Sequence, residues 1–126
     1  MDIEQRKYIR FSVQDNTFAS LGRKFRTVGR INDISIRGLA LSYLCDNTKA
    51  GLDRDYSEVD IFLSGDNFYL PEVNCKIVYN IQDSKSNKNS SIMKRRCGLH
   101  FDKLSKSQSK LLELFLKNYT TGPLSS

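Results

Sequence analysis

Hydrophobic and polar residues alternate along much of the chain, which is the pattern of half-buried β-strands. The clearest case is residues 73–81, where Val73, Cys75, Ile77, Tyr79 and Ile81 are predicted to share one face. Shorter β-like runs, separated by turn-forming residues, occur around Phe18 and at 26–31, 39–43, 59–63 and 92–101. The pattern therefore predicts about six antiparallel strands.

The end of the chain follows a different period. Ser105 and Gln108 have the spacing of a capping box, in which a serine and a glutamine satisfy the first backbone groups of a helix. The apolar residues Leu104, Leu111, Leu112, Phe115 and Tyr119 lie on one helical stripe. These features predict an amphipathic helix over 104–120, stopped by Gly122 and Pro123.

The segments between these elements are polar. Residues 1–16 have no clear period and are interpreted as a flexible N-terminal arm, while 45–57 and 83–91 are interpreted as loops. Strands at regular spacing followed by one helix favour a small antiparallel barrel, with the helix packed on it. We expect a single domain over residues 1–126, with the barrel at 17–103.

Bulk properties narrow the class of protein. A length of 126 residues suits one domain with its own core, and 39% hydrophobic and 27% charged residues are ordinary for a soluble protein. No apolar run is long enough to span a membrane, and the N-terminus lacks the order of a signal peptide, so we expect a cytoplasmic protein. A start at Met1 and an end beyond the helix favour a whole protein. The three cysteines, Cys45, Cys75 and Cys97, form no CxxC pair and are expected to be reduced, partly buried thiols.

The formal net charge of +6 and the sequence pI of about 9.3 favour anionic partners, although a basic surface can also serve solubility alone.

Two short motifs, one basic and one acidic, are candidates for ligand binding. Arg6 and Arg10 lie four residues apart on the arm, and Asp33, Ser35 and Gly38 form a D-x-S-x-x-G turn between strands.

These residue types suit a guanine nucleotide. A guanidinium group can stack on a base, bind the O6/N7 edge of guanine, and pair with phosphate. A carboxylate can accept hydrogen bonds from the N–H groups of guanine, and a serine hydroxyl can reach a phosphate oxygen. Gly38 permits a positive φ or a close approach of the backbone. Each motif is common by itself, and only their joint occurrence on a β-rich domain is specific.

The sequence resembles the PilZ domain family, the bacterial receptors of cyclic di-GMP, whose signature is RxxxR followed by (D/N)xSxxG. Cys97-Gly98-Leu99-His100-Phe101 is similar to a late strand of that family. The resemblance implies a six-stranded antiparallel barrel with a C-terminal helix, and cyclic di-GMP as ligand. It also implies that Arg6 and Arg10 grip guanine and phosphate, that Asp33 binds a guanine edge, that Ser35 contacts the phosphate region and that Gly38 shapes the turn.

Two positions depart from the family pattern. Arg37 stands where a second glycine is frequent, and it is expected either to contact phosphate or, by slight preference, to point to solvent. Gln5 stands where some members carry a further arginine, which favours one bound cyclic di-GMP over a stacked pair. Lys7 and Gly98 are further candidate ligand contacts, in addition to Arg37.

No catalytic motif accompanies the signature. His100 is the only histidine and has no partner at catalytic or metal-binding spacing, so we expect no enzyme activity, no metal and no cofactor. The basic cluster 93–96 could support ligand or nucleic-acid binding, but a solvated strand end is the favoured interpretation.

We therefore predict a cyclic di-GMP receptor or adaptor whose arm is loosely ordered until the ligand binds, and which signals to an unidentified effector protein. A ligand-independent PilZ-like interaction module is the alternative, and a small nucleic-acid-binding barrel is a less favoured one.

Overall fold

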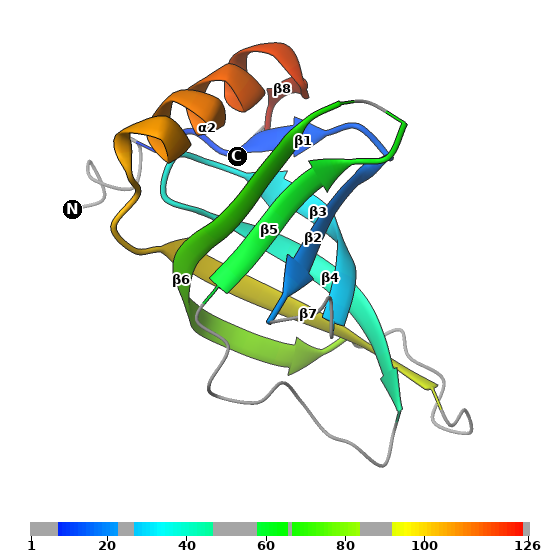
Figure 1. Cartoon of the computed structure of the whole chain (residues 1–126). Coiled ribbons are helices and arrows are strands. Elements are labelled where there is room, and N and C mark those ends of the chain that lie inside the picture. Colours follow the sequence, from blue (N-terminus) through cyan, green and yellow to red (C-terminus); the bar gives the residue numbers. More distant parts are fainter. Residues whose placement is uncertain (1–7, 23–26, 47–57, 66, 84–91, 125–126) are drawn as a thin grey trace, which may run out of the picture.

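The strands form one antiparallel sheet that closes on itself as a barrel (Figure 1). The computed structural model describes residues 8–22, 27–46, 58–65, 67–83 and 92–124. The closed part follows the order β2, β5, β6, β7, β4 and β3, and a further pairing of β2 with β3 completes the circle. Its strands are β2 (Thr17–Leu21), β3 (Thr27–Ile34), β4 (Gly38–Asp46), β5 (Glu58–Leu63), β6 (Tyr69–Gln82) and β7 (Ile92–Phe101). The predicted six-stranded antiparallel barrel is thus confirmed.

The barrel interior holds the hydrophobic core. In β5, Val59, Ile61 and Leu63 are buried and alternate with partly exposed residues, as the sequence pattern predicts. Leu39 and Leu41 of β4 also face inward. Since successive side chains of a strand point to opposite faces, the residues between them lie on the outside of the barrel.

The prediction that 73–81 keeps one buried face along its whole length is wrong. Val73 and Cys75 are buried, but Ile81 is 53% exposed. The pairing of β6 with β7 shifts between Ile77 and Tyr79, so one extra residue is inserted there. A β-bulge of this kind reverses the faces of all later residues, and it turns Tyr79 and Ile81 outward.

The interpretation of 1–16 as an unstructured arm is also wrong for part of its length. Residues Phe11–Val13 form a short strand, β1, which pairs with β3 on one side and with β8 (Thr120–Pro123) on the other. The residues after the helix were predicted only to end it, and they form a strand instead. Together β1 and β8 extend the sheet beyond the closed barrel.

The C-terminal helix, α2, spans Lys106–Asn118 and is slightly shorter than predicted. The predicted capping box is present, because the Ser105 side chain accepts from the Gln108 N–H and the Gln108 side chain accepts from the Ser105 N–H. Phe115 is fully buried, and its ring lies 5.1 Å from that of Phe68, between centroids. Within the described part of the chain, no helix has the length and apolarity that a membrane span requires.

Candidate ligand-binding site

Asp33 is a carboxylate on the outer face of the barrel. It lies near the end of β3, opposite Ala40 of β4 and opposite Ser12 of β1. Only 7% of its side chain is exposed, because neighbouring strands and side chains surround it. A charged group this well covered needs partners.

Arg10 is the main partner of Asp33. Its Nε and Nη2 donate to Oδ1 at 3.0 and 2.8 Å, and Nη2 also donates to Oδ2 at 2.9 Å. The pairing of β1 with β3 brings these two side chains together across 23 positions of sequence. The expectation that Arg10 is only loosely ordered is therefore wrong, since its guanidinium grips Asp33 from the edge of the barrel.

Arg96 belongs to the basic cluster 93–96, for which the sequence favours a solvated strand end, and it is a second cation at Asp33. Its Nη2 lies 3.8 Å from Asp33 Oδ2, and 44% of its side chain is exposed. Arg96 faces outward from β7, opposite Ser42 of β4. The pairing register of β3, β4 and β7 brings Arg96 to Asp33. The alternation of apolar and polar residues in the sequence does not predict that register.

Ser35 and Gly38 build a tight turn beside Asp33. The Ser35 Oγ accepts the backbone N–H groups of Arg37 at 3.0 Å and of Gly38 at 3.3 Å. The Ser35 N–H donates to the Gly38 carbonyl at 2.8 Å. Ser35 is buried. Its hydroxyl oxygen accepts these two hydrogen bonds within the turn, and its O–H group can still donate one.

Gly38 is required because of close approach, not because of a positive φ. A Cβ at this position would collide with the backbone carbonyl oxygen of Leu99 and would lie 3.1 Å from the Cα of His100. The same turn is tied to β7 by the N–H of Phe101, which donates to the Arg37 carbonyl at 2.7 Å. The turn that follows Asp33 is thus fixed to the neighbouring strand.

Arg37 contacts the N-terminal segment. Its guanidinium carbon lies 4.7 Å from the centroid of the Tyr8 ring, and its Nη1 donates to the Tyr8 hydroxyl at 3.1 Å. The slight preference for a side chain that merely points to solvent is therefore wrong, although Arg37 itself is exposed. This contact joins the turn to the residues that lead to Arg10.

Gly98 lies in the same row of the sheet as Asp33 and Ala40. The ring of Tyr79 packs over it, so closely that a Cβ on Gly98 would overlap the ring. Gly98 is buried under this ring.

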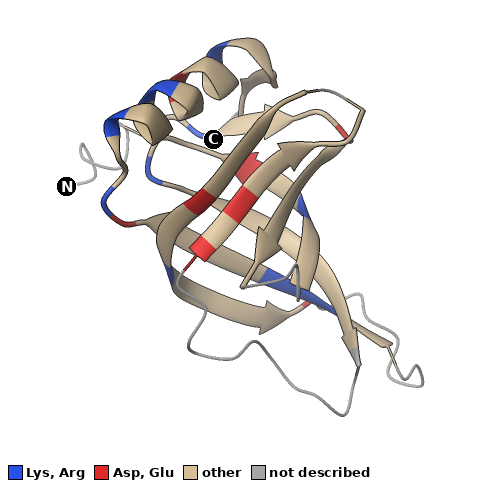
Figure 2. Ribbon diagram, viewed as in Figure 1, with Lys and Arg blue, Asp and Glu red and all other residues tan. Residues whose placement is uncertain are grey.

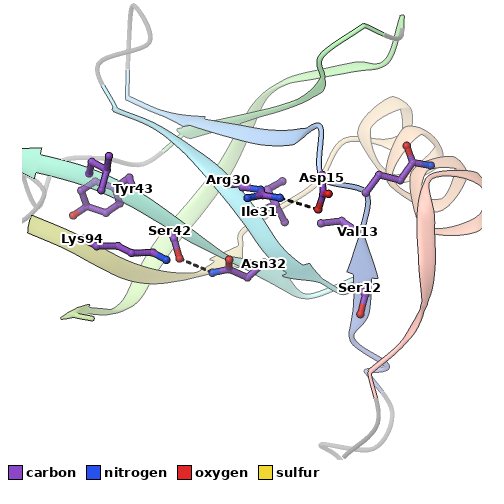
Figure 3. Close-up of a pocket in the computed structure, with 11 residues that line it drawn as sticks. Ser12, Val13, Asp15, Arg30, Ile31, Asn32, Ser42, Tyr43 and Lys94 are labelled. Atoms are coloured by element: carbon purple, nitrogen blue, oxygen red, sulfur yellow. Dashed lines mark hydrogen bonds and ion pairs between the residues drawn. The ribbon is translucent and has the colours of Figure 1, made fainter. Parts of the chain in front are cut away.

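A groove of about 500 Å³ lies on the same face (Figure 3), and its lining includes Ser12 and Asn32, the pairing partner and the preceding residue of Asp33. Its wall includes Arg30 and Asp15, whose Nη2 and Oδ1 are 2.7 Å apart, and Asn32, whose Nδ2 donates to Ser42 Oγ at 2.9 Å.

Figure 2 shows the charge around the barrel: acidic residues gather on β5 and β6, and basic residues occur on α2 and β7.

Among the remaining candidates, Arg6 and Lys7 lie outside the described residues. His100 is exposed on β7. Burial raises the pKa of the Cys75 thiol to about 12 and that of the Cys97 thiol to about 11, so both are protonated at neutral pH. Within the described ranges, no three histidine, cysteine or acidic side chains are grouped so as to hold a metal ion.

The fold and the site define a small closed barrel whose polar site lies on its outer wall. The sequence matches the PilZ domain family over residues 4–118, so the chain belongs to that family. Its fold is similar to that of the PilZ domain of YcgR from Escherichia coli with c-di-GMP (TM-score 0.65, 14% identity, covering 91% of each chain).

It is also similar to YcgR from Escherichia coli in complex with c-di-GMP (TM-score 0.63, 14% identity), covering 90% of this chain and 45% of that one. The chain thus spans less than half of that longer protein. A comparison with curated proteins gave no match.

Proposed function

We propose that this PilZ domain is a non-catalytic receptor that binds cyclic di-GMP on its outer wall. The observation that carries the proposal is the grip of Arg10 on the covered carboxylate of Asp33. The two similar YcgR structures, both with c-di-GMP, support the choice of ligand.

Asp33 is the guanine acceptor in this proposal. The N1–H and N2–H groups of guanine form a flat pair of parallel donors, which resembles the edge of a guanidinium group. Arg10 therefore occupies the Asp33 edge that guanine needs. On binding, guanine takes over the carboxylate, and Arg10 moves to a phosphate or to the O6/N7 edge of the base.

The residues around Asp33 complete the site. Arg96 lies within reach of Asp33 and supplies positive charge for the phosphates. The Ser35 hydroxyl donates to the phosphate region, and Gly38 keeps the turn close to β7. Arg37 of the turn and Lys7 of the arm add positive charge, and Gly98 gives the ligand room once the Tyr79 ring moves. Arg6 closes over the guanine from the arm.

The first test is isothermal titration calorimetry of the unmodified chain with cyclic di-GMP, with cyclic di-AMP as the control ligand. We expect one cyclic di-GMP per chain, a dissociation constant on the order of 1 μM, and much weaker binding of cyclic di-AMP, which cannot offer the N1–H and N2–H donor pair. Absence of heat with cyclic di-GMP, or equal binding of both ligands, would contradict the proposal.

Signalling to an effector protein belongs to the same proposal. When Arg10 leaves Asp33, the contact between Arg37 and Tyr8 offers a route by which the N-terminal segment changes position. A partner that binds only one arrangement of this segment would detect the ligand, because a ligand shifts an equilibrium only through differential affinity.

Hydrogen exchange checks this part of the proposal. Amides of residues 1–12 are expected to change their exchange rates on addition of cyclic di-GMP, whereas those of α2 should not change. Unaltered exchange in 1–12 under conditions of saturating ligand would rule out this segment as the reporter.

A further inference from the structure

The groove beside Asp33 contains a second acid–arginine pair. Asp15 lies in the turn between β1 and β2, and Arg30 lies on β3, three residues before Asp33. Arg30 Nη2 and Asp15 Oδ1 are 2.7 Å apart. Figure 3 marks this contact with a dashed line. At a rise of about 3.3 Å per strand residue, this pair is displaced by roughly 10 Å along β3 from the pair formed by Asp33 and Arg10.

Both pairs face the same surface. Arg30 lies opposite Ser42 of β4, and Ser42 lies opposite Arg96 of β7. Arg96 in turn reaches Asp33. Directly opposite residues of an antiparallel sheet share a face, so Arg30, Arg96 and Asp33 lie on the same outer face of the barrel.

The two pairs differ in how firmly they are held. The Asp15 side chain is 96% exposed and that of Arg30 is 56% exposed, whereas Asp33 is covered. Exposed ion pairs contribute little to stability. A ligand can therefore separate Asp15 from Arg30 at small cost, and a purely structural role for this pair is correspondingly minor.

We propose that this groove is a second guanine subsite, in which Asp15 accepts the N1–H and N2–H of the ligand's other base. The inference rests on the proposed function, because it assigns the second half of the same cyclic dinucleotide. Arg30 turns to the O6/N7 edge or to phosphate, and the hydrogen-bonded Asn32–Ser42 pair lines the groove.

The groove suits this occupant in size and chemistry. Its volume of about 500 Å³ lies within the usual range for small-ligand sites. A dinucleotide with two identical bases requires the same recognition chemistry twice, and an acid–arginine pair occurs twice on this face. Adenine would be disfavoured at Asp15, because its N1 carries no hydrogen and cannot donate a hydrogen bond to the carboxylate.

The experiment compares two ligands on three proteins by calorimetry. The ligands are cyclic di-GMP and the hybrid cyclic dinucleotide with one guanine and one adenine. The proteins are the unmodified chain, Asp15→Ala and Glu113→Ala, the last of which removes an exposed carboxylate from α2 as a matched control. Thermal unfolding of each variant checks that the barrel is intact.

We expect the unmodified chain and Glu113→Ala to prefer cyclic di-GMP to the hybrid by about tenfold, the scale of one hydrogen bond to a charged group. In Asp15→Ala the preference should fall to about twofold, chiefly through weaker binding of cyclic di-GMP. Wild-type preference in a folded Asp15→Ala variant would overturn the second subsite and leave the proposed function intact. Absence of cyclic di-GMP binding by the unmodified chain would overturn both.

Discussion

Replacement of Asp33 by alanine is expected to weaken cyclic di-GMP binding at least about 100-fold, because two charge-assisted hydrogen bonds to guanine are lost. The fold should survive this change. Arg10 and Arg96 are each about half exposed, so water solvates them when their carboxylate is removed. Arg10→Ala is a less clean probe, since among the described residues it leaves the covered Asp33 with only the 3.8 Å ionic contact to Arg96.

General electrostatics makes the opposite prediction for Asp33→Ala. Removal of a negative charge from a basic protein should strengthen the binding of an anionic ligand. Glu113→Ala changes the net charge equally at a distant helix position and should leave binding unchanged or slightly tighter. Calorimetric titration of both variants separates the two effects. Retention of affinity in a folded Asp33→Ala variant would exclude this carboxylate as the guanine acceptor.

Gly38→Ala is expected to lower the free energy of unfolding by about 3 kcal/mol, the upper part of the range for overpacking. The added Cβ meets the backbone of Leu99 and His100, which no side-chain rotation can relieve. For a domain of this size the thermal midpoint should fall by roughly 10 °C. The turn that carries Ser35 is expected to separate from β7, which would also weaken ligand binding.

Gly65→Asn is the matched control for Gly38→Ala. Nothing lies within 4 Å of a Cβ at Gly65, and the φ of +89° is positive, a region that asparagine tolerates better than most residues. We expect a loss of less than about 1 kcal/mol, the scale of a backbone preference. Equal stability losses in the two variants, measured by thermal or denaturant unfolding, would show that crowding at Gly38 is not the cause.

Local patterns predicted most of the barrel. Alternation located β5 and the inward face of β4, and the capping box located the start of α2. The short strand β1 escaped prediction because Phe11–Val13 is too short for a period, and its stability comes from β3 and β8, both distant in sequence. The bulge after Ile77 could not be predicted, because apolar and polar residues continue to alternate in the sequence where the pairing of β6 with β7 shifts by one residue.

The candidate site could likewise be predicted only where its residues belong to motifs that are local in the sequence. Asp33 and Arg10 were found because their motifs are local, and the structure brings them together as an ion pair. Arg96 and the pair of Asp15 with Arg30 depend on strand register and on a turn. In a chain with 20 lysine and arginine residues, position along the sequence does not distinguish these cations from solvated ones.

We propose that Asp33 exchanges the guanidinium of Arg10 for a guanine edge when cyclic di-GMP binds. The most direct measurement is a crystal structure of this chain with cyclic di-GMP. We expect a guanine whose N1–H and N2–H donate to Asp33, with Arg10 moved to phosphate or to O6/N7. A bound ligand that leaves the Arg10–Asp33 pair unchanged and makes no contact with Asp33 would contradict it.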